Sequence, residues 1–521
     1  MTGGLCYPFP MLKRAIAVFF SSLAWFSFLI PWDRFPDPDA FYHAKLSLLL
    51  WQQGPIRAFP WLDLTTLGKT FDDQHLLFHV IEAPFVTMSG WATGARVTGI
   101  LLSAIFVTAC FICFRLLGIR RPLAWTALLA ATSPLIMRLL LGKASPLALT
   151  LFVLGLTFVW KRKLIGVFII GILFALSHGG WAFLLGAAGF LAIGDVLHTQ
   201  MIDRRSWRFA IVASPWKELI ACSIGVLLGL IIHPNFPANL SVLWVQVVKI
   251  GLGTPYGQVP LGREWFPSSI FDVAASFAPW AIALIIGMSG VFLAARRPLD
   301  REGARAATSF AWPVAAFVAL TLKSRRNGEY LAPALALWIP WLWNMIDFAA
   351  FRRVLVRGWS KRRQQMTVGL LSVLLLGVLM KGVWDARTAL RLTASTDDVF
   401  REAMAPISAA AHPGDRVFHS DWDEFPMLFN IDDRLRYVSG LDPTFLYEAS
   451  SSLSNAYRDV TWKTASATQA EAWSLIHDRL DAKFILVAKS DHAAVADLLE
   501  TDPRYHRLAE TDDAVSFSVQ P

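Results

Sequence analysis

Long runs of apolar residues recur from residue 13 to residue 384, separated by short polar segments. A helix of about 20 apolar residues crosses the hydrocarbon core of a bilayer. Counting runs near this length, several of them short, predicts eleven membrane-spanning helices. They cover residues 13–31, 96–117, 122–141, 145–160, 164–180, 181–198, 217–233, 273–295, 305–322, 329–350 and 366–384.

The pattern changes after residue 384. The stretches RVFHS, RYVSG, KFILVAK and AVSFSV are typical of strands, and residues 469–480 and 491–500 are typical of helices. Residues 385–521 are therefore predicted to form a small soluble α/β domain. Residues 1–384 form the predicted transmembrane domain, with two long polar outer loops at 32–95 and 234–272. Within the first loop, segment 75–91 is expected to lie along the membrane surface as a helix, because it contains two histidines, a glutamate and a proline.

Composition supports the same fold class. Hydrophobic residues make up 55% of the chain and charged residues 17%, which excludes an ordinary soluble globular protein and a disordered chain. The chain is predicted to be a polytopic α-helical membrane protein. Residues 1–384 carry a net charge of +19 and residues 385–521 a net charge of −10. We attribute the basic charge to loops on the inner side of the membrane, so no nucleic acid partner is expected.

The basic loops also predict the orientation. With Lys13 and Arg14 in the cytoplasm, most other basic clusters fall on the same side, at residues 115–121, 161–163, 204–208, 296–301 and 352–363. Both long loops and the C-terminal domain then lie outside the cell's inner (plasma) membrane, on its periplasmic or extracytoplasmic face.

A few cations break this rule. Lys143 and the segment containing Lys323, Arg325 and Arg326 fall on the predicted outer side. Cations retained there indicate an anionic ligand. The alternative is that they face lipid headgroups or water.

The first outer loop carries two groups of polar residues. Asp37 and Asp39 flank Pro38 directly after the first span, where two carboxylates can bind a divalent cation or orient a nucleophile. The alternative is a solvated turn. The second group is Asp72, Asp73, His75 and His79.

Several histidines lie near the same membrane face. His75 and His79 are four residues apart, so they share a helix face that suits a metal or a carboxylate partner. Histidines without any ligand are the alternative. His43 follows the aspartate pair, and His178 lies in SHGGW at another outer end of a span.

Two further elements carry candidate chemistry. Glu264, in GREWFP of the second outer loop, is a candidate base or metal ligand, although a salt bridge to Arg263 is an alternative. Trp422 and Asp423, in HSDWDEFPMLF of the C-terminal domain, combine an aromatic ring and an acid that suit a sugar or an acceptor.

The order of these elements resembles the catalytic subunit of oligosaccharyltransferases, which are membrane glycosyltransferases of the GT-C superfamily. The resemblance implies transfer of a sugar or glycan from a polyprenyl (pyro)phosphate to an acceptor glycan, lipid or protein on the outer face. It also implies roles for individual residues. Asp39 resembles the catalytic and metal-binding aspartate, Glu264 the fifth-loop glutamate, Arg326 or Arg325 the arginine that binds the lipid phosphate, and Trp422 and Asp423 the start of the WWDYG acceptor motif.

The chain departs from the family where a second acidic motif is expected. It has LLLGKASPLAL there, with Lys143 and no carboxylate. A protonated lysine does not ligate a cation. Two alternatives follow: Lys143, Arg325 and Arg326 stabilise the leaving phosphate without a cofactor, or Asp39 and Glu264 hold Mg²⁺ or Mn²⁺. DWDEF also differs from WWDYG, which favours an acceptor other than Asn-x-Ser/Thr.

Two non-enzymatic functions compete with this hypothesis. A transporter or flippase of lipid-linked sugars needs ionisable residues deep inside the spans, and Arg138 is one of few candidates, near the end of a span. An assembly subunit that has lost its active site is the other.

Overall fold

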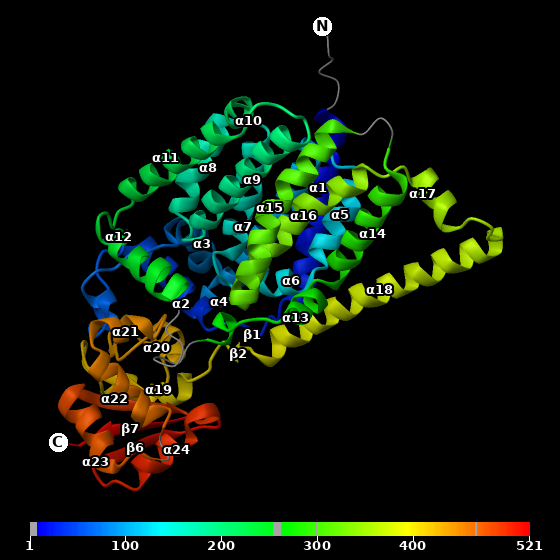
Figure 1. The fold of residues 1–521 in the computed structure, drawn as a ribbon. Coiled ribbons are helices and arrows are strands. Elements are labelled where there is room, and N and C mark those ends of the chain that lie inside the picture. Colours follow the sequence, from blue (N-terminus) through cyan, green and yellow to red (C-terminus); the bar gives the residue numbers. More distant parts are fainter. Residues whose placement is uncertain (1–7, 254–261, 297–299, 464–465, 521) are drawn as a thin grey trace.

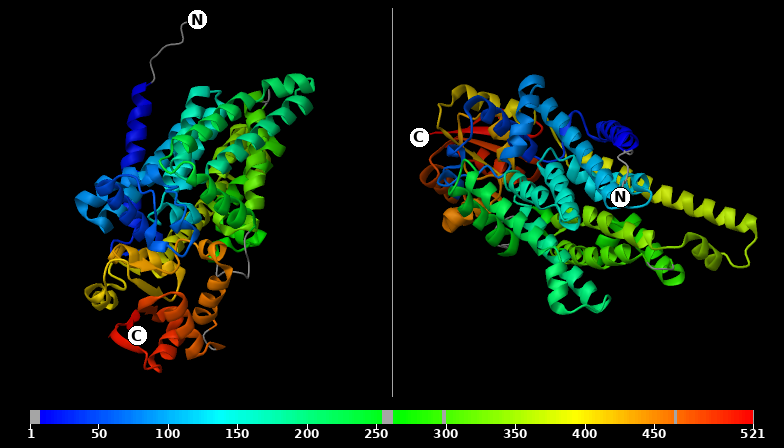
Figure 2. Two further views of the ribbon diagram at one scale, coloured as in Figure 1. Left: turned by 90° about the vertical axis from the view of Figure 1, so that its left-hand side faces the viewer. Right: turned by 90° about the horizontal axis from the view of Figure 1, so that it is seen from above.

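The computed structural model describes residues 8–253, 262–296, 300–463 and 466–520. A bundle of helices forms the larger part of the molecule, and a smaller part with a β-sheet lies at one end of the bundle (Figure 1). The same arrangement is clear from the side (Figure 2, left).

All eleven predicted spans are helical. By length and composition, five helices qualify to cross a membrane: α1 (Pro8–Leu29, from Met11), α4 (Trp91–Leu116), α9 (Trp181–Met201), α15 (Arg301–Lys323) and α18 (Lys361–Leu392). Three helix pairs qualify only as bent spans, with bends of 70°, 43° and 92°. These are α5 (Pro122–Ala130) with α6 (Ser133–Leu139), α10 (Trp207–Ala213) with α11 (Trp216–Ile232), and α13 (Ile270–Ser276) with α14 (Ala278–Ala294).

The three remaining predicted spans are shorter helices. They are α7 (Ser145–Trp160), α8 (Leu164–Ala175) and α16 (Gly328–Asn344). Almost every side chain of α7 and α16 is buried, as expected for helices that are apolar on all sides. The described residues thus contain five to eight helices that qualify as spans, and a total of eleven crossings stays a prediction. A short helix, α17 (Phe348–Leu355), precedes α18.

The two predicted outer loops contain helices of their own. The first holds β1 (Arg34–Phe35), α2 (Asp39–Gln53), η1 (Pro60–Leu62), η2 (Thr66–Gly68) and α3 (Leu76–Ser89). The predicted helix at 75–91 is therefore present as α3, and its place on the membrane surface stays a prediction. The second loop holds α12 (Ala238–Leu243), η3 (Trp244–Gly253) and η4 (Arg263–Trp265), and its residues 254–261 lie outside the described part of the chain.

The C-terminal part is built on a five-stranded mixed sheet with the order β4-β3-β5-β7-β6. Strands β3, β4 and β5 are parallel, and β7 and β6 continue the sheet antiparallel. The four predicted strands are present. Sequence analysis missed β6, an edge strand whose side chains are mostly exposed. The strands are β3 (Arg416–His419), β4 (Arg436–Tyr437), β5 (Ala482–Ala488), β6 (Tyr505–Glu510) and β7 (Ala514–Val519).

Helices surround this sheet (Figure 1). The predicted helices at 469–480 and 491–500 are found as α23 with η8, and as α24. The set is α19 (Arg401–Ala410), η6 (Trp422–Glu424), α20 (Phe425–Ile431), α21 (Thr444–Ala449), α22 (Ser451–Thr461), α23 (Gln469–Trp473), η8 (Ser474–Arg479) and α24 (Lys489–Glu500).

The C-terminal part packs on the first outer loop. Arg416 donates to both carboxylate oxygens of Asp63, at 3.0 and 2.8 Å, and the Trp61 ring nitrogen donates to the Asp433 carbonyl. Strand β1 pairs antiparallel with β2 (Ser395–Thr396). The predicted domain boundary after residue 384 falls inside α18, which continues to Leu392. The loop and the sheet are thus held together over the same end of the bundle.

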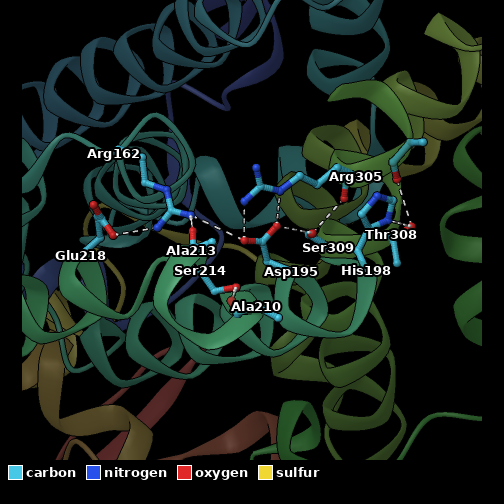
Figure 3. Close-up of polar contacts among 11 residues, drawn as sticks. Arg162, Asp195, His198, Ala210, Ala213, Ser214, Glu218, Arg305, Thr308 and Ser309 are labelled. Atoms are coloured by element: carbon cyan, nitrogen blue, oxygen red, sulfur yellow. Dashed lines mark hydrogen bonds and ion pairs between the residues drawn. The ribbon is translucent and has the colours of Figure 1, made fainter. Parts of the chain in front are cut away.

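A buried group of charges joins the helices at their other end (Figure 3). Asp195 of α9 is fully buried and accepts two hydrogen bonds from Arg305 of α15, at 2.5 and 2.7 Å. Arg162, in the turn between α7 and α8, lies 3.5 Å from Asp195 and 3.1 Å from Glu218 of α11. Four segments of the bundle are therefore connected through ion pairs.

Candidate functional site

Lys143 lies between the two aspartates of the first outer loop. Its Nζ is 2.8 Å from Oδ2 of Asp37 and 2.7 Å from Oδ2 of Asp39. The preceding Gly142 has φ of 73°, and a Cβ there would stand 2.8 Å from the Cβ of Ala40. Only glycine allows this turn to approach α2 so closely. The backbone therefore brings the lysine to the carboxylates.

Lys143 and the two aspartates stabilise one another's charged forms. Burial by itself would lower the pKa of Lys143, but Asp37 and Asp39 outweigh it and hold that pKa above its usual range. Burial raises the pKa of Asp37, and Lys143 opposes the rise. Lys143 is thus an ammonium ion at neutral pH.

A second group forms around Glu264. Its Oε2 lies 2.8 Å from Arg138, and its Oε1 accepts a hydrogen bond of 3.0 Å from Arg326. Burial would raise the pKa of Glu264, but Arg326, Arg138 and Lys143 outweigh it and hold that pKa far below its usual range. Glu264 is therefore a carboxylate that accepts protons poorly. The side chain of Arg263, the alternative partner, lies outside the described residues.

The histidines of the first loop form a chain of contacts. His79 is 2.8 Å from Oδ1 of Asp73, and its other ring nitrogen is 2.8 Å from Nδ1 of His43. The ring of His75 lies edge-on to that of His43 and tilted to that of His178, with centroids 5.0 and 5.3 Å away. The His79 ring thus has the predicted carboxylate partner, Asp73, whereas His75 contacts Asp73 through its backbone amide.

Three of these histidines, His43, His75 and His178, are held in an uncharged state. Burial lowers the pKa of His178 to about 3 and that of His75 well below its usual value, with nearby cations adding to the effect. Burial likewise lowers the pKa of His43. His178 also accepts a hydrogen bond from the Gly180 amide within SHGGW. Neutral rings beside the cations limit repulsion in the site.

Asp72 faces a different partner. Its Oδ1 lies 3.3 Å from Nδ1 of His233, which contacts the Asp73 carbonyl through its other ring nitrogen. Burial, together with Asp73, raises the pKa of Asp72 to about 7. Asp72 therefore changes charge near neutral pH.

The structure separates some of the predicted site residues. Arg326 contacts Glu264, whereas Arg325 is exposed, and its amide donates to the Phe266 carbonyl. Trp422 and Asp423 lie in the C-terminal domain beside Asp421 and Glu424, in a group that also includes His492. They form a second cluster rather than part of the Lys143 group.

Sequence analysis missed three residues of the site. Arg138 was considered only as a possible transport residue, and Glu329 lies 3.8 Å from it. A lone arginine five residues before Lys143 was the available signal. Asp442 follows β4 in the C-terminal domain. Burial raises its pKa, and Arg326 and Glu264 are among the charges that act on it. Nothing in the local sequence marked Asp442.

The donor set does not fit a divalent cation. The two carboxylates best placed to bind one, Asp37 and Asp39, already hold the Lys143 ammonium, and two like charges exclude each other at one site. Glu264 is similarly held by Arg138 and Arg326. Among the described residues, no group of three or more His, Cys, Asp and Glu side chains is arranged to hold a metal. The candidate contacts for an anionic ligand are the three cations of this group, Lys143, Arg138 and Arg326.

Comparison with known proteins supports the fold. The sequence matches no protein-family model and no curated protein. An oligosaccharyltransferase from Archaeoglobus fulgidus, tethered to an acceptor peptide with the NVT sequon, matches with a TM-score of 0.59 and 13% identity. The match covers 98% of this chain and 74% of that one. Another structure of the same enzyme is a complex with Zn and sulfate, with a TM-score of 0.57, 12% identity, and 96% and 73% coverage.

Two other transferases share this architecture. ArnT from Cupriavidus metallidurans has a TM-score of 0.52 and 13% identity, with 98% of this chain and 97% of that chain covered. The arabinofuranosyltransferase AftD from Mycobacteria has a TM-score of 0.58 and 13% identity, covering 98% of this chain and 40% of that one. This chain therefore has the fold of the GT-C membrane glycosyltransferases, as the sequence resemblance predicted.

Proposed function

We propose that this protein is a membrane glycosyltransferase that moves a sugar or glycan from a polyprenyl (pyro)phosphate donor to an acceptor on the outer face of the membrane. The observation that carries the proposal is the meeting of Lys143, Arg138 and Arg326 with Asp37, Asp39 and Glu264 where the bundle joins the C-terminal domain. The fold shared with known membrane glycosyltransferases supports it.

The cations suit the leaving group. A polyprenyl phosphate departs as an anion, so fixed positive charge lowers the energy of the transition state. Lys143 is held by two carboxylates, and Arg326 is held by Glu264 while 40% of its side chain remains exposed. Both cations are preorganised, and Arg326 is accessible to a phosphate. Arg325 is exposed next to it and is a second candidate contact.

Asp39 is the proposed base. Its Oδ2 contacts Lys143, while 29% of the side chain is exposed and Oδ1 takes no part in that ion pair. Asp39 accepts the proton of an acceptor hydroxyl, the acceptor oxygen bonds to the anomeric carbon, and the bond from that carbon to the phosphate oxygen breaks. This in-line attack inverts the anomeric configuration. Glu264 instead positions Arg138 and Arg326, because those arginines keep it ionised.

The acceptor contacts are proposed in two places. Asp37, His43 and His75 lie near Lys143, together with Asp72, Asp73, His79 and His178 of the same outer region. Trp422 and Asp423 lie in the C-terminal domain, where an aromatic ring and an acid suit a more distant sugar of a long acceptor.

Orientation is part of the proposal. The site and the C-terminal domain face outward from the inner (plasma) membrane, and the turn that contains Arg162 faces the cytoplasm. Single cysteines at position 162 and at the exposed position 412 of the C-terminal part, each in a background with Cys6, Cys110, Cys113 and Cys222 replaced by serine, test this in intact spheroplasts. An impermeant maleimide should label position 412 and spare 162. The reverse result contradicts the orientation.

The function is tested with the purified full chain in lipid nanodiscs. It is incubated with polyprenyl phosphates carrying different sugars, and release of free polyprenyl phosphate is measured together with sugar transfer. Arg326→Ala should lose most of the activity, and Arg57→Ala, at an exposed position of the first loop, serves as the control for loss of an arginine. In sealed proteoliposomes, transfer of intact donor between leaflets without cleavage of its sugar–phosphate bond would establish a flippase instead.

A further inference from the structure

A large groove lies between α18 and helices α1, α5 and α14. Its volume is about 840 Å³. Helix α18 runs obliquely away from the bundle (Figure 2, right). The side chains of its most hydrophobic stretch are not buried against the rest of the protein. The groove is lined by apolar side chains of α5, α14 and α18, such as Trp125, Leu128, Ile282, Leu376 and Leu379. An apolar groove that opens toward lipid is filled by hydrocarbon chains in a membrane.

Three arginines lie at one end of this groove. Arg120, Arg121 and Arg296 line it. Each contacts a residue of segment 344–348, which includes the last residue of α16. The Arg120 amide donates to Asn344 Oδ1, the Arg296 guanidinium donates to the Ile346 carbonyl, and the Arg121 guanidinium lies 5.3 Å from the Phe348 ring centre. The guanidinium groups of Arg296 and Arg121 therefore contact the same short segment, and Arg120 lines the groove next to Arg121.

The positive charge at this end is only partly offset: Asp347 of the neighbouring segment interacts with Arg296, but its carboxylate caps α17 through the Ala349 and Ala350 amides. Among the described residues, no aspartate or glutamate lines the groove. Arg120 and Arg121 are exposed and Arg296 is half-buried. Neighbouring arginines with exposed donors suit a phosphate, which they bind through several charge-assisted hydrogen bonds. The required ligand therefore has an anionic head and an apolar body.

The length of the groove limits which lipid fits. Along α18 the lining runs from Leu375 to Arg387, which is about 18 Å at 1.5 Å per residue. One leaflet of the hydrocarbon core is about 15 Å thick. The groove thus matches the acyl chains of a lipid in one leaflet, and it is shorter than a polyprenyl chain that spans the bilayer core.

We propose that this groove binds an anionic phospholipid, with its phosphate at Arg120, Arg121 and Arg296 and its acyl chains between α18 and helices α5 and α14. The bound lipid fills the space between the bundle and α18, the helix that leads to the C-terminal domain. In the proposed orientation the headgroup belongs to the cytoplasmic leaflet. The proposal does not depend on the transferase activity.

The test uses native mass spectrometry of the full chain with phosphatidylglycerol and phosphatidylcholine of identical acyl chains. The unmodified protein should retain phosphatidylglycerol with at least about tenfold preference. The triple variant Arg120→Gln, Arg121→Gln and Arg296→Gln should fall to within about twofold. Arg204→Gln, Arg205→Gln and Arg208→Gln together form the matched control, because they remove the same charge from exposed positions at the same end of the bundle, and they should keep the preference.

A second variant tests the apolar part of the groove. Ala127 lines it and is exposed, so Ala127→Trp fills the space without disturbing the core and should weaken phosphatidylglycerol retention while the arginines remain. Equal lipid preference in the triple variant and the unmodified protein would overturn the proposal. Displacement of phosphatidylglycerol by one equivalent of polyprenyl phosphate would assign the groove to that lipid instead. Equal competition by glycerol phosphate would reduce it to a phosphate site without a lipid groove.

Discussion

The ammonium group of Lys143 lies 2.7 Å from Oδ2 of Asp39, the carboxylate that resembles the catalytic aspartate of oligosaccharyltransferases. A cation supplied by the chain itself therefore stands beside the proposed base. Asp37 contacts the same ammonium from its other side, so Lys143 is fixed in position. This pairing leads to predictions for the effect of metal removal and of Lys143 substitutions on the transferase activity.

We expect the transferase activity to survive EDTA. Lys143 supplies positive charge for the leaving phosphate, so Lys143→Ala should reduce kcat by about 10²–10³, the usual effect of losing one electrostatic contact to the transition state. Lys143→Arg should retain part of the activity, because it keeps the charge. Turnover of a lipid-linked sugar is measured for each variant with and without EDTA.

Loss of activity in EDTA would contradict this prediction. Activity that EDTA abolishes and Mn²⁺ or Mg²⁺ restores would show that a metal is required and that Lys143 leaves the aspartates when the metal binds. Lys69→Ala, at an exposed position of the same loop, serves as the control for loss of a lysine and should leave turnover unchanged.

Asp39→Asn tests the proposed base. The amide keeps the shape of the side chain but accepts no proton, so kcat should fall by about 10²–10⁴ with little change in KM for the donor. Asp33→Asn is the matched control, since Asp33 is an exposed carboxylate of the same loop. Near-normal turnover of Asp39→Asn would remove Asp39 from the proposed mechanism.

The positions of the helices could be predicted from the sequence, but their bends could not. Apolar runs located all eleven helical segments, because burial in lipid or in the bundle requires them. The run at 122–141 reads as one span, yet it bends by 70° between α5 and α6. Ser133 and Pro134 begin α6 there, and a Ser-Pro pair is a turn signal that hydropathy alone does not weigh.

The site could be predicted only in part, because some of its residues are brought together by tertiary contacts. Asp39, Glu264 and Arg326 were identified from motifs, but the contact of Lys143 with Asp37 and Asp39 joins segments about 100 residues apart and depends on the turn at Gly142. Asp442, of the C-terminal part, is within electrostatic reach of Arg326 and Glu264, which lie more than 100 residues earlier in the chain. Neither tertiary contact leaves a pattern in the local sequence.

The buried charges at the other end of the bundle should be essential for stability. Asp195→Ala leaves Arg305 and Arg162 without their buried carboxylate, and removing one partner of a buried ion pair typically costs about 3–5 kcal/mol. Glu302→Ala is the control, since Glu302 pairs with Lys161 at the surface and should cost less than about 1 kcal/mol. Thermal unfolding in detergent measures both variants. An equal, small change in the two midpoints would show that the Asp195 contacts contribute little.

Asp72 should make stability depend on pH. Its pKa is about 7 in the folded protein against 3.8 for an unperturbed aspartate. Between about pH 4 and pH 7 the unfolded chain releases this proton while the folded protein still holds it, so the contribution of Asp72 to stability falls as pH rises. Above pH 7 both states are ionised and the loss is constant.

Asp72→Asn removes this dependence, because an amide stays neutral at every pH in this range. The stability advantage of the variant over the unmodified protein should therefore grow as the pH rises from 5 to 8. The growth should be on the order of 1–3 kcal/mol in free energy of unfolding, and it is measured from the midpoints of thermal unfolding. Asp398→Asn, at an exposed position of the C-terminal part, should leave the pH profile unchanged. If the difference between Asp72→Asn and the unmodified protein is constant from pH 5 to pH 8, Asp72 does not titrate in this range and its burial does not hold the proton.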